Sequence, residues 1–156
     1  MVFHDGFELK AWKEFLTKPE FQGNVVLDTH QYLMTAESLG CKQTLNGYIE
    51  YIQENFARDI AEVQEYAPVV VGEWSLFNAY IMDSCKKEGG LTPESKKHFY
   101  AQLAKAQLAA WQGGSGYIYW NYKMLLDTVR EPRWKGWDCW DLGKSVELGW
   151  FPVNAE

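Results

Sequence analysis

The stretch Ala67-Pro68-Val69-Val70-Val71-Gly72-Glu73-Trp74-Ser75 decides the fold class of this chain. Three consecutive β-branched residues predict a strand that is buried on both faces, which is typical of parallel sheets. A carboxylate, Glu73, stands where this strand ends. At the carboxyl ends of parallel strands, α/β proteins gather side chains from separate units around a substrate. Glu73 is therefore the first candidate catalytic residue.

Three other stretches have the same design. Two are apolar runs that end in polar and aromatic groups, Asn24-Val25-Val26-Leu27-Asp28-Thr29-His30-Gln31-Tyr32 and Gly116-Tyr117-Ile118-Tyr119-Trp120-Asn121-Tyr122-Lys123. A shorter and weaker one is Met1-Val2-Phe3-His4-Asp5-Gly6-Phe7. Between the strands, helical spacing of apolar residues predicts helices over residues 8–16, 45–66, 92–111 and 140–148. The chain thus reads as four successive strand–helix units, which predicts an α/β fold.

The third predicted helix has the clearest start. Thr92 can cap it, Pro93 suits the first helical position, and Glu94 lies favourably in the positive first turn. The glycine-rich run Gly113-Gly114-Ser115-Gly116 follows this helix and precedes a strand, and no Gly-Lys-Ser/Thr completes a phosphate-binding loop. We interpret it as a helix terminator and turn.

Composition limits the possible functions. A chain of 156 residues with 47% hydrophobic content can bury a real core, and a single domain over residues 1–156 is the default. We expect no membrane-spanning segment and no N-terminal leader. A formal charge of −6 argues against a nucleic-acid partner. Three scattered cysteines, Cys41, Cys85 and Cys139, do not suit a disulfide scaffold, and neither a metal-ligand spacing nor a cofactor motif is evident.

The aromatic content is unusually high, at 16% with eight tryptophans. Several of them crowd the last stretch of the chain, and Trp120 stands at the end of its predicted strand. Aromatic rings can pack a core or form platforms for the C–H faces of sugars. Packing is the ordinary role of any single tryptophan. Trp120 is the exception, because we expect it to share the strand-end rim with Glu73, His30 and Tyr32.

The order of these motifs resembles the C-terminal half of glycoside hydrolase family 5, and most closely its exo-β-1,3-glucanase branch. The resemblance covers nearly the whole chain and rests on the following segments: Phe3-His4-Asp5-Gly6-Phe7, Val26-Leu27-Asp28-Thr29-His30-Gln31-Tyr32, Gly72-Glu73-Trp74-Ser75, Tyr119-Trp120-Asn121-Tyr122-Lys123 and Leu148-Gly149-Trp150-Phe151-Pro152. It implies strands 5 to 8, with their helices, of a TIM (β/α)8 barrel, and a retaining glycosidase that acts on a β-glucan or an oligosaccharide without a cofactor.

Roles for single residues follow from the resemblance. Glu73 matches the nucleophile at the end of the seventh strand, and Tyr32 matches the tyrosine that would hydrogen bond it and help to keep it ionised. His30 would contact the carboxylates or the sugar, and Trp120 would form the floor of the subsite for the cleaved sugar. Weaker candidates for the substrate-binding rim are Trp74, His4, Asp5 and Lys123.

The departure from the family pattern is equally informative. Retaining hydrolysis needs two carboxyl groups about 5 Å apart. The resemblance implies that the proton donor is the Glu of an Asn-Glu-Pro motif after the fourth strand, and this chain contains no Asn-Glu-Pro. Glu54-Asn55 has the reverse order and lies in a helical pattern, so it is no substitute. A complete barrel typically needs roughly 250 residues. We therefore expect a fragment that lacks the acid/base residue and is nearly inactive alone, with open strand edges that pair with a missing N-terminal half or with a second copy.

Alternatives remain open at the level of the sequence. Glu73 could merely pair with a buried cation, and His30 could be an ordinary core histidine. The chain could be a sugar-binding or structural remnant that does no chemistry, or its substrate could be a β-1,4-glucan or a mannan. The sequence does not predict a compartment: the resemblance suits secretion, whereas unpaired cysteines favour a reducing environment.

Overall fold

The computed structural model describes residues 1–21 and 23–152 and has an α/β architecture. Its strands form one sheet in sequence order, and every neighbouring pair is parallel, as predicted. This sheet is compatible with half of a (β/α)8 barrel. The strands are β1 (Val2–His4), β2 (Val26–His30), β3 (Val69–Trp74) and β4 (Gly116–Tyr119).

The predicted helices are present, with shorter bounds at the two ends of the chain. The helix predicted over 45–66 is continuous but contains a π-helical segment, Ile52–Ala57, between α3 and α4. Two short helices, α2 and α5, were not predicted. The helices are α1 (Trp12–Leu16), α2 (Leu33–Ser38), α3 (Leu45–Tyr51), α4 (Arg58–Gln64), α5 (Ala79–Lys86), α6 (Pro93–Trp111) and α7 (Leu142–Glu147).

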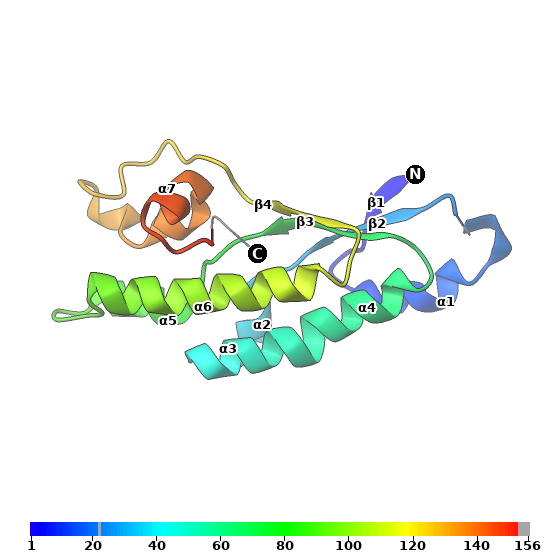
Figure 1. The fold of residues 1–156 in the computed structure, drawn as a ribbon, viewed down its shortest axis with the longest axis horizontal. Helices are drawn as coiled ribbons and strands as arrows, with labels where there is room; N and C mark the ends of the chain where they lie inside the picture. The colour runs from blue at the N-terminus through cyan, green and yellow to red at the C-terminus, as the bar shows by residue number, and fades with distance from the viewer. Residues whose placement is uncertain (22, 153–156) are drawn as a thin grey trace.

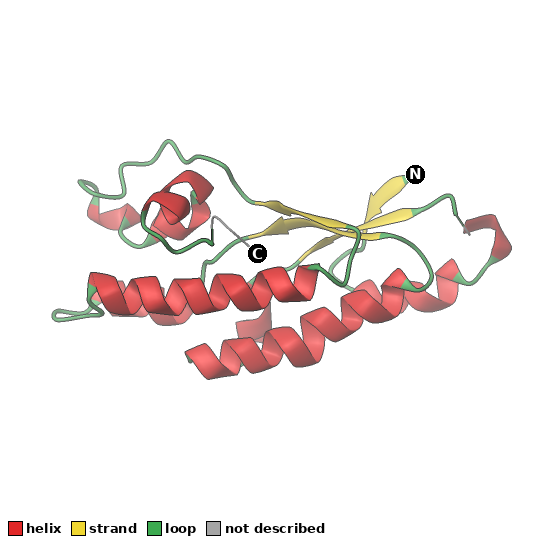
Figure 2. Cartoon of the chain, in the orientation of Figure 1, coloured by secondary structure: helices red, strands yellow, loops and turns green. Residues whose placement is uncertain are grey.

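The long helices lie on one side of the sheet. Figures 1 and 2 show α3, α4 and α6 beneath the strands, while the opposite face carries no helix over its middle in the described part of the chain. The C-terminal segment with α7 lies on that opposite side, beyond the carboxyl ends of β3 and β4 (Figure 1). Among the described residues, no helix has the length and apolar character that crossing a membrane requires.

The side chains of the strands follow this arrangement. On the helix-covered face, Leu27, Val69 and Val71 are completely buried. On the uncovered face, Val2 and Ile118 keep 67% and 59% of their surface exposed. Within the described residues, β1 and β4 also have one free edge each. One face of the sheet is therefore covered by the helices and apolar, and the other face is uncovered.

A bulge in β3 decides which side chains reach the open face. Thr29 is paired with Val71, but the next residue of β2, His30, is paired with Glu73, so Gly72 is the extra residue. One additional residue in a strand reverses the alternation of side chains beyond it. Glu73 consequently lies on the same face as His30, and Trp74 turns into the core.

Candidate active site

The candidate nucleophile is held by two side chains from β2 and the residues that follow it. The Tyr32 hydroxyl donates a hydrogen bond to Glu73 Oε2 over 2.7 Å, and His30 Nδ1 lies 3.3 Å from the same oxygen. The Glu73 side chain keeps 25% of its surface exposed, which leaves room for a ligand. The structure thus brings together the three residues to which the sequence assigned catalysis, at the carboxyl end of the sheet.

The Tyr32 hydroxyl keeps its proton well above neutral pH and so remains a hydrogen-bond donor. Burial, and then its hydrogen bond to Glu73, raises the pKa of this phenol far above its ordinary value of about 10. A neutral phenol donates a hydrogen bond to a carboxylate and keeps its proton, and charge-assisted hydrogen bonds of this kind are short and strong. Tyr32 therefore holds Glu73 Oε2 in place through a short hydrogen bond.

His4 and Asp5 occupy different positions relative to this cluster. The His4 ring lies edge-on against His30, with 4.3 Å between the ring centroids, and its Nδ1 accepts a hydrogen bond from the Gly6 amide. Asp5 is only 2% exposed, and its carboxylate accepts hydrogen bonds from the Thr29 hydroxyl (2.7 Å) and the Phe7 amide (2.9 Å). Asp5 therefore fixes the turn after β1. Because it is buried, it does not form part of a sugar-binding surface.

Trp74 does not lie on the substrate-binding rim where the sequence placed it. Its side chain is fully buried, and its ring packs edge-on against Trp111 and Tyr119, with centroid distances of 5.8 and 4.9 Å. The bulge at Gly72 is the physical reason, because it sends the residue after Glu73 to the helix-covered face. Trp74 is therefore a core residue that supports the site from beneath.

Trp120 lies on an aromatic surface near the nucleophile. It is 48% exposed and follows β4, with its amide donating to the carbonyl of Trp74. The bond between Trp120 and Asn121 is a cis peptide. A shallow hollow of about 300 Å³ is lined by Trp120, Asn121, Met124, Trp137 and Trp140.

The hollow is linked to Glu73 through Trp140. The Trp140 ring lies 5.4 Å from that of Tyr32, which in turn holds the nucleophile. Sequence reasoning did not assign Trp137 or Trp140 to the site. The signal that could have found them is the concentration of tryptophans after β4. Lys123 is exposed two residues beyond the hollow-lining Asn121, and among the described residues it makes no ion pair.

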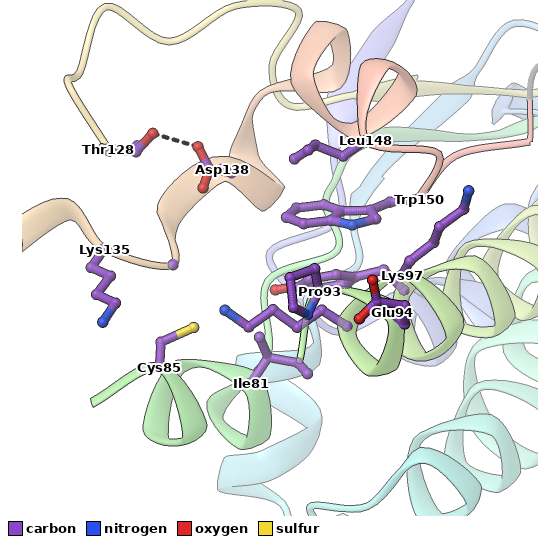
Figure 3. Close-up of a pocket in the computed structure, with 13 residues that line it drawn as sticks. Ile81, Cys85, Pro93, Glu94, Lys97, Thr128, Lys135, Asp138, Leu148 and Trp150 are labelled. Atoms are coloured by element: carbon purple, nitrogen blue, oxygen red, sulfur yellow. Dashed lines mark hydrogen bonds between the residues drawn. The ribbon is translucent and has the colours of Figure 1, made fainter. Parts of the chain in front are cut away.

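A larger cavity, of about 530 Å³, lies elsewhere, between α5, the start of α6 and the C-terminal segment (Figure 3). Its walls include Ile81, Glu94 and Trp150, and at one side the Thr128 hydroxyl donates a hydrogen bond to Asp138. None of the eight predicted site residues lines it. We place the candidate active site at Glu73, because Tyr32 and His30 both contact its carboxylate and the described lining of the larger cavity has no comparable arrangement.

Comparison with known proteins finds relatives that are named as glucan glucosidases. No family model matches the chain. The chain is 28% identical to a glucan 1,3-beta-glucosidase of Yarrowia lipolytica over 186 aligned positions, which cover 97% of this chain and 39% of that protein. It is 26% identical to a glucan 1,3-beta-glucosidase of Kluyveromyces lactis, with the same coverage of both proteins. A shorter match, 33% identical over 89 positions, covers 57% of this chain and 19% of a glucan endo-1,6-beta-glucosidase B of Emericella nidulans.

These similarities support a glycoside hydrolase. The chain spans about two-fifths of the length of the two glucan 1,3-beta-glucosidases. The alignments are longer than the chain itself, so these relatives carry additional residues between the matched segments.

Proposed function

We propose that this chain supplies the nucleophilic half of the active site of a retaining β-glucan hydrolase of glycoside hydrolase family 5, built as strands 5 to 8 of a (β/α)8 barrel. The observation that carries the proposal is the contact of Tyr32 and His30 with a single oxygen of Glu73 at the carboxyl end of a parallel sheet. Names of the relatives favour a β-1,3-glucan or an oligosaccharide derived from it as substrate.

Glu73 would act through its second carboxylate oxygen. Tyr32 and His30 both lie against Oε2, and among the described residues Oε1 has no hydrogen-bond partner. Oε1 would attack the anomeric carbon to form a covalent glycosyl-enzyme, while the electron pair of the broken bond leaves with the aglycone oxygen. Trp120 and the hollow beside it would hold the sugar through its C–H face.

The proton donor for the leaving group would come from residues outside this chain. The chain has no Asn-Glu-Pro, and Glu54 lies in the π-helical segment of the helix layer. The carboxylate of Asp28, on the neighbouring strand, contacts the opposite nitrogen of the His30 ring from Glu73. On natural glucans the chain alone should therefore be nearly inactive, and an N-terminal half-barrel that brings a second carboxyl group should restore hydrolysis.

A substrate that needs no proton donor isolates the role of Glu73. With 2,4-dinitrophenyl β-glucoside the leaving group departs as a stable anion, so glycosylation of Glu73 requires no acid. We expect a burst of dinitrophenolate followed by slow turnover. Azide should accelerate the turnover, because it is a nucleophile that needs no general base and so replaces the base-activated water. The azide attacks the anomeric carbon, frees the Glu73 carboxylate and gives β-glucosyl azide.

The matched variants are Glu73→Gln and Glu54→Gln. Glu73→Gln should abolish the burst, because an amide is a poor nucleophile, and Glu54→Gln should leave it unchanged. A full burst from Glu73→Gln would remove Glu73 from the nucleophile's role.

The aromatic hollow supports a second candidate, a sugar-binding module without chemistry. Such a module would bind laminari-oligosaccharides in calorimetric titration but release no dinitrophenolate. The same titration with cello- and manno-oligosaccharides would reveal a preference for β-1,4 linkages.

A further inference from the structure

Trp137 lines two spaces at the surface of the chain. One is the aromatic hollow of about 300 Å³ that also includes Trp120 and Trp140. The other is a third cavity, of about 660 Å³. The third cavity has apolar and charged walls, which include Phe77, Met82, Asp83 and Arg133. Trp137 is therefore a wall that the hollow and the third cavity share.

Aromatic rings connect the candidate nucleophile to the third cavity. The Tyr32 ring, whose hydroxyl contacts Glu73, lies 5.4 Å from the Trp140 ring between centroids. The Trp140 ring in turn lies 6.4 Å from that of Trp137 and 5.2 Å from that of Phe77. Phe77, Trp137 and Trp140 are only partly buried, so part of each side chain remains exposed. Such a row offers apolar contacts to the C–H faces of consecutive sugar units.

The charged groups around the third cavity are mostly paired with one another or with a neighbour. Asp83 Oδ1 lies 3.2 Å from Lys86 Nζ, and Arg133 Nε lies 2.8 Å from Glu131 Oε2. Lys135 is the one lining cation that makes no ion pair in the described part of the chain. Charges that largely cancel suit a neutral ligand. An apolar wall with polar groups at its border suits a sugar in particular, because a sugar presents both C–H faces and hydroxyls.

Trp137 lies outside every segment on which the family resemblance rests. Those segments reach Lys123 and resume only at Leu148. The resemblance therefore assigns no role to Trp137 or to the third cavity.

We propose that Trp137 is a specificity-determining residue that extends the substrate-binding surface from the hollow into the third cavity. This inference rests on the proposed function and deepens it. The substrate is a β-glucan chain of several units, and the units beyond the one at Glu73 lie along Trp137 and Phe77.

Calorimetric titration with laminari-oligosaccharides of different length tests the inference without requiring turnover. The unmodified chain should bind laminarihexaose more tightly than laminaribiose, because only the longer molecule reaches the third cavity. Trp137→Ala should lower the affinity for laminarihexaose by about 10- to 30-fold, as the truncation of an aromatic anchor does. The affinity for laminaribiose should change much less, so the preference for the longer molecule is lost.

Arg133→Ala is a second variant that carries little risk for folding, because the Arg133 side chain is 72% exposed. It should also weaken the binding of laminarihexaose more than that of laminaribiose. Tyr122→Ala is the matched control, because Tyr122 is an exposed aromatic residue outside the described lining of both spaces. It should leave both affinities unchanged. Circular dichroism checks that each variant is folded.

Equal affinities of the unmodified chain for laminaribiose and laminarihexaose would overturn the inference. A folded Trp137→Ala chain that keeps the preference for laminarihexaose would also overturn it. If Trp137→Ala does not fold, Arg133→Ala decides, and an unchanged preference in that variant counts against the inference.

The outcome is distinguishable from that of the proposed function. A length preference that Trp137→Ala removes, in a chain that shows no dinitrophenolate burst, would contradict only the proposed hydrolase. A burst that depends on Glu73, in a chain without a length preference, would contradict only the role of Trp137.

Discussion

Glu73 and Trp74 are adjacent in the sequence, yet they lie on opposite faces of the sheet because Gly72 forms the bulge. The sequence motifs predicted the cluster of Glu73, His30 and Tyr32, since polar residues at the ends of neighbouring parallel strands converge. They could not predict the fate of Trp74 or Asp5. A bulge is a matter of strand register, and the burial of Asp5 depends on a hydroxyl from the neighbouring strand.

Tyr32→Phe tests the main contact of the nucleophile. The substitution removes the hydroxyl that donates to Glu73 Oε2 and leaves the ring against Trp140. Losing a hydrogen bond to a charged group costs about 1.5–3 kcal/mol, so the dinitrophenolate burst should slow about 10- to 100-fold. Tyr122→Phe is the control, because Tyr122 is 74% exposed. Equal burst rates for Tyr32→Phe and Tyr122→Phe would show that the contact is irrelevant to reactivity.

At the scale of elements, the sequence predicted most where local signals are strong. All four strands and the start of α6 are confirmed, and the Thr92 hydroxyl accepts a hydrogen bond from the Ser95 amide as a helix cap should. The helices α2 and α5 were missed because six and eight residues are too few for a clear period. Each lies in the connection between a strand and the long helix that follows it.

The Thr92 cap should contribute measurably to stability. Thr92→Ala removes the acceptor for a backbone amide at the start of α6, which should lower the free energy of unfolding by about 1 kcal/mol. Urea denaturation followed by circular dichroism measures this change. Thr92→Ser keeps an acceptor and should lose much less. If Thr92→Ala and Thr92→Ser were equally stable, the hydrogen bond of the Thr92 side chain would not be what stabilises the start of α6.

A buried group of phenols and a thiol ties α6 and β4 to the C-terminal segment and should make the fold sensitive to alkali. Burial raises the pKa of Tyr100 and Tyr119, and it raises the pKa of Cys139 to about 12. Between the ordinary pKa values, about 8.5–10, and these raised ones, the unfolded chain releases protons that the folded chain retains. The contribution of these groups to stability should therefore be constant below about pH 8.5. It should fall at higher pH by about 1.4 kcal/mol per pH unit for each group whose ordinary pKa has been passed.

Urea midpoints measured from pH 8 to 11 check this prediction. Tyr119→Phe should make the fall of the urea midpoint with pH less steep, by the contribution of one group. Tyr122→Phe should leave the slope unchanged, because Tyr122 is exposed. A midpoint that stays constant up to pH 11 would contradict the burial of these groups.

At the scale of the whole molecule, the sheet is covered by helices on one face only. Ile118 and Val2 are exposed on the other face, and β1 and β4 each have a free edge in the described part of the chain. Exposed apolar surface beside unpaired strand edges favours association. We propose that an N-terminal half-barrel covers this face, or a second copy of the chain when that half is missing.

Self-association through the open face can be measured on the chain itself. Sedimentation velocity should show concentration-dependent association, and Ile118→Asn should weaken it by placing an amide on the apolar face. Leu125→Asn is the matched control, because Leu125 is 97% exposed but lies in the loop after β4. A well-folded monomer at every concentration, with no partner present, would contradict the idea that this face must be covered.

The measurement that tests the central claim most directly is the position of the covalent intermediate. 2,4-Dinitrophenyl 2-deoxy-2-fluoro-β-glucoside forms a slowly hydrolysed adduct with a glycosidase nucleophile, and mass spectrometry of the digested chain locates the added sugar. We predict one fluoroglucosyl group per chain, on the peptide that contains Glu73, and none on Glu73→Gln. An adduct on another residue, with Glu73 unmodified, would contradict the assignment of Glu73 as the nucleophile.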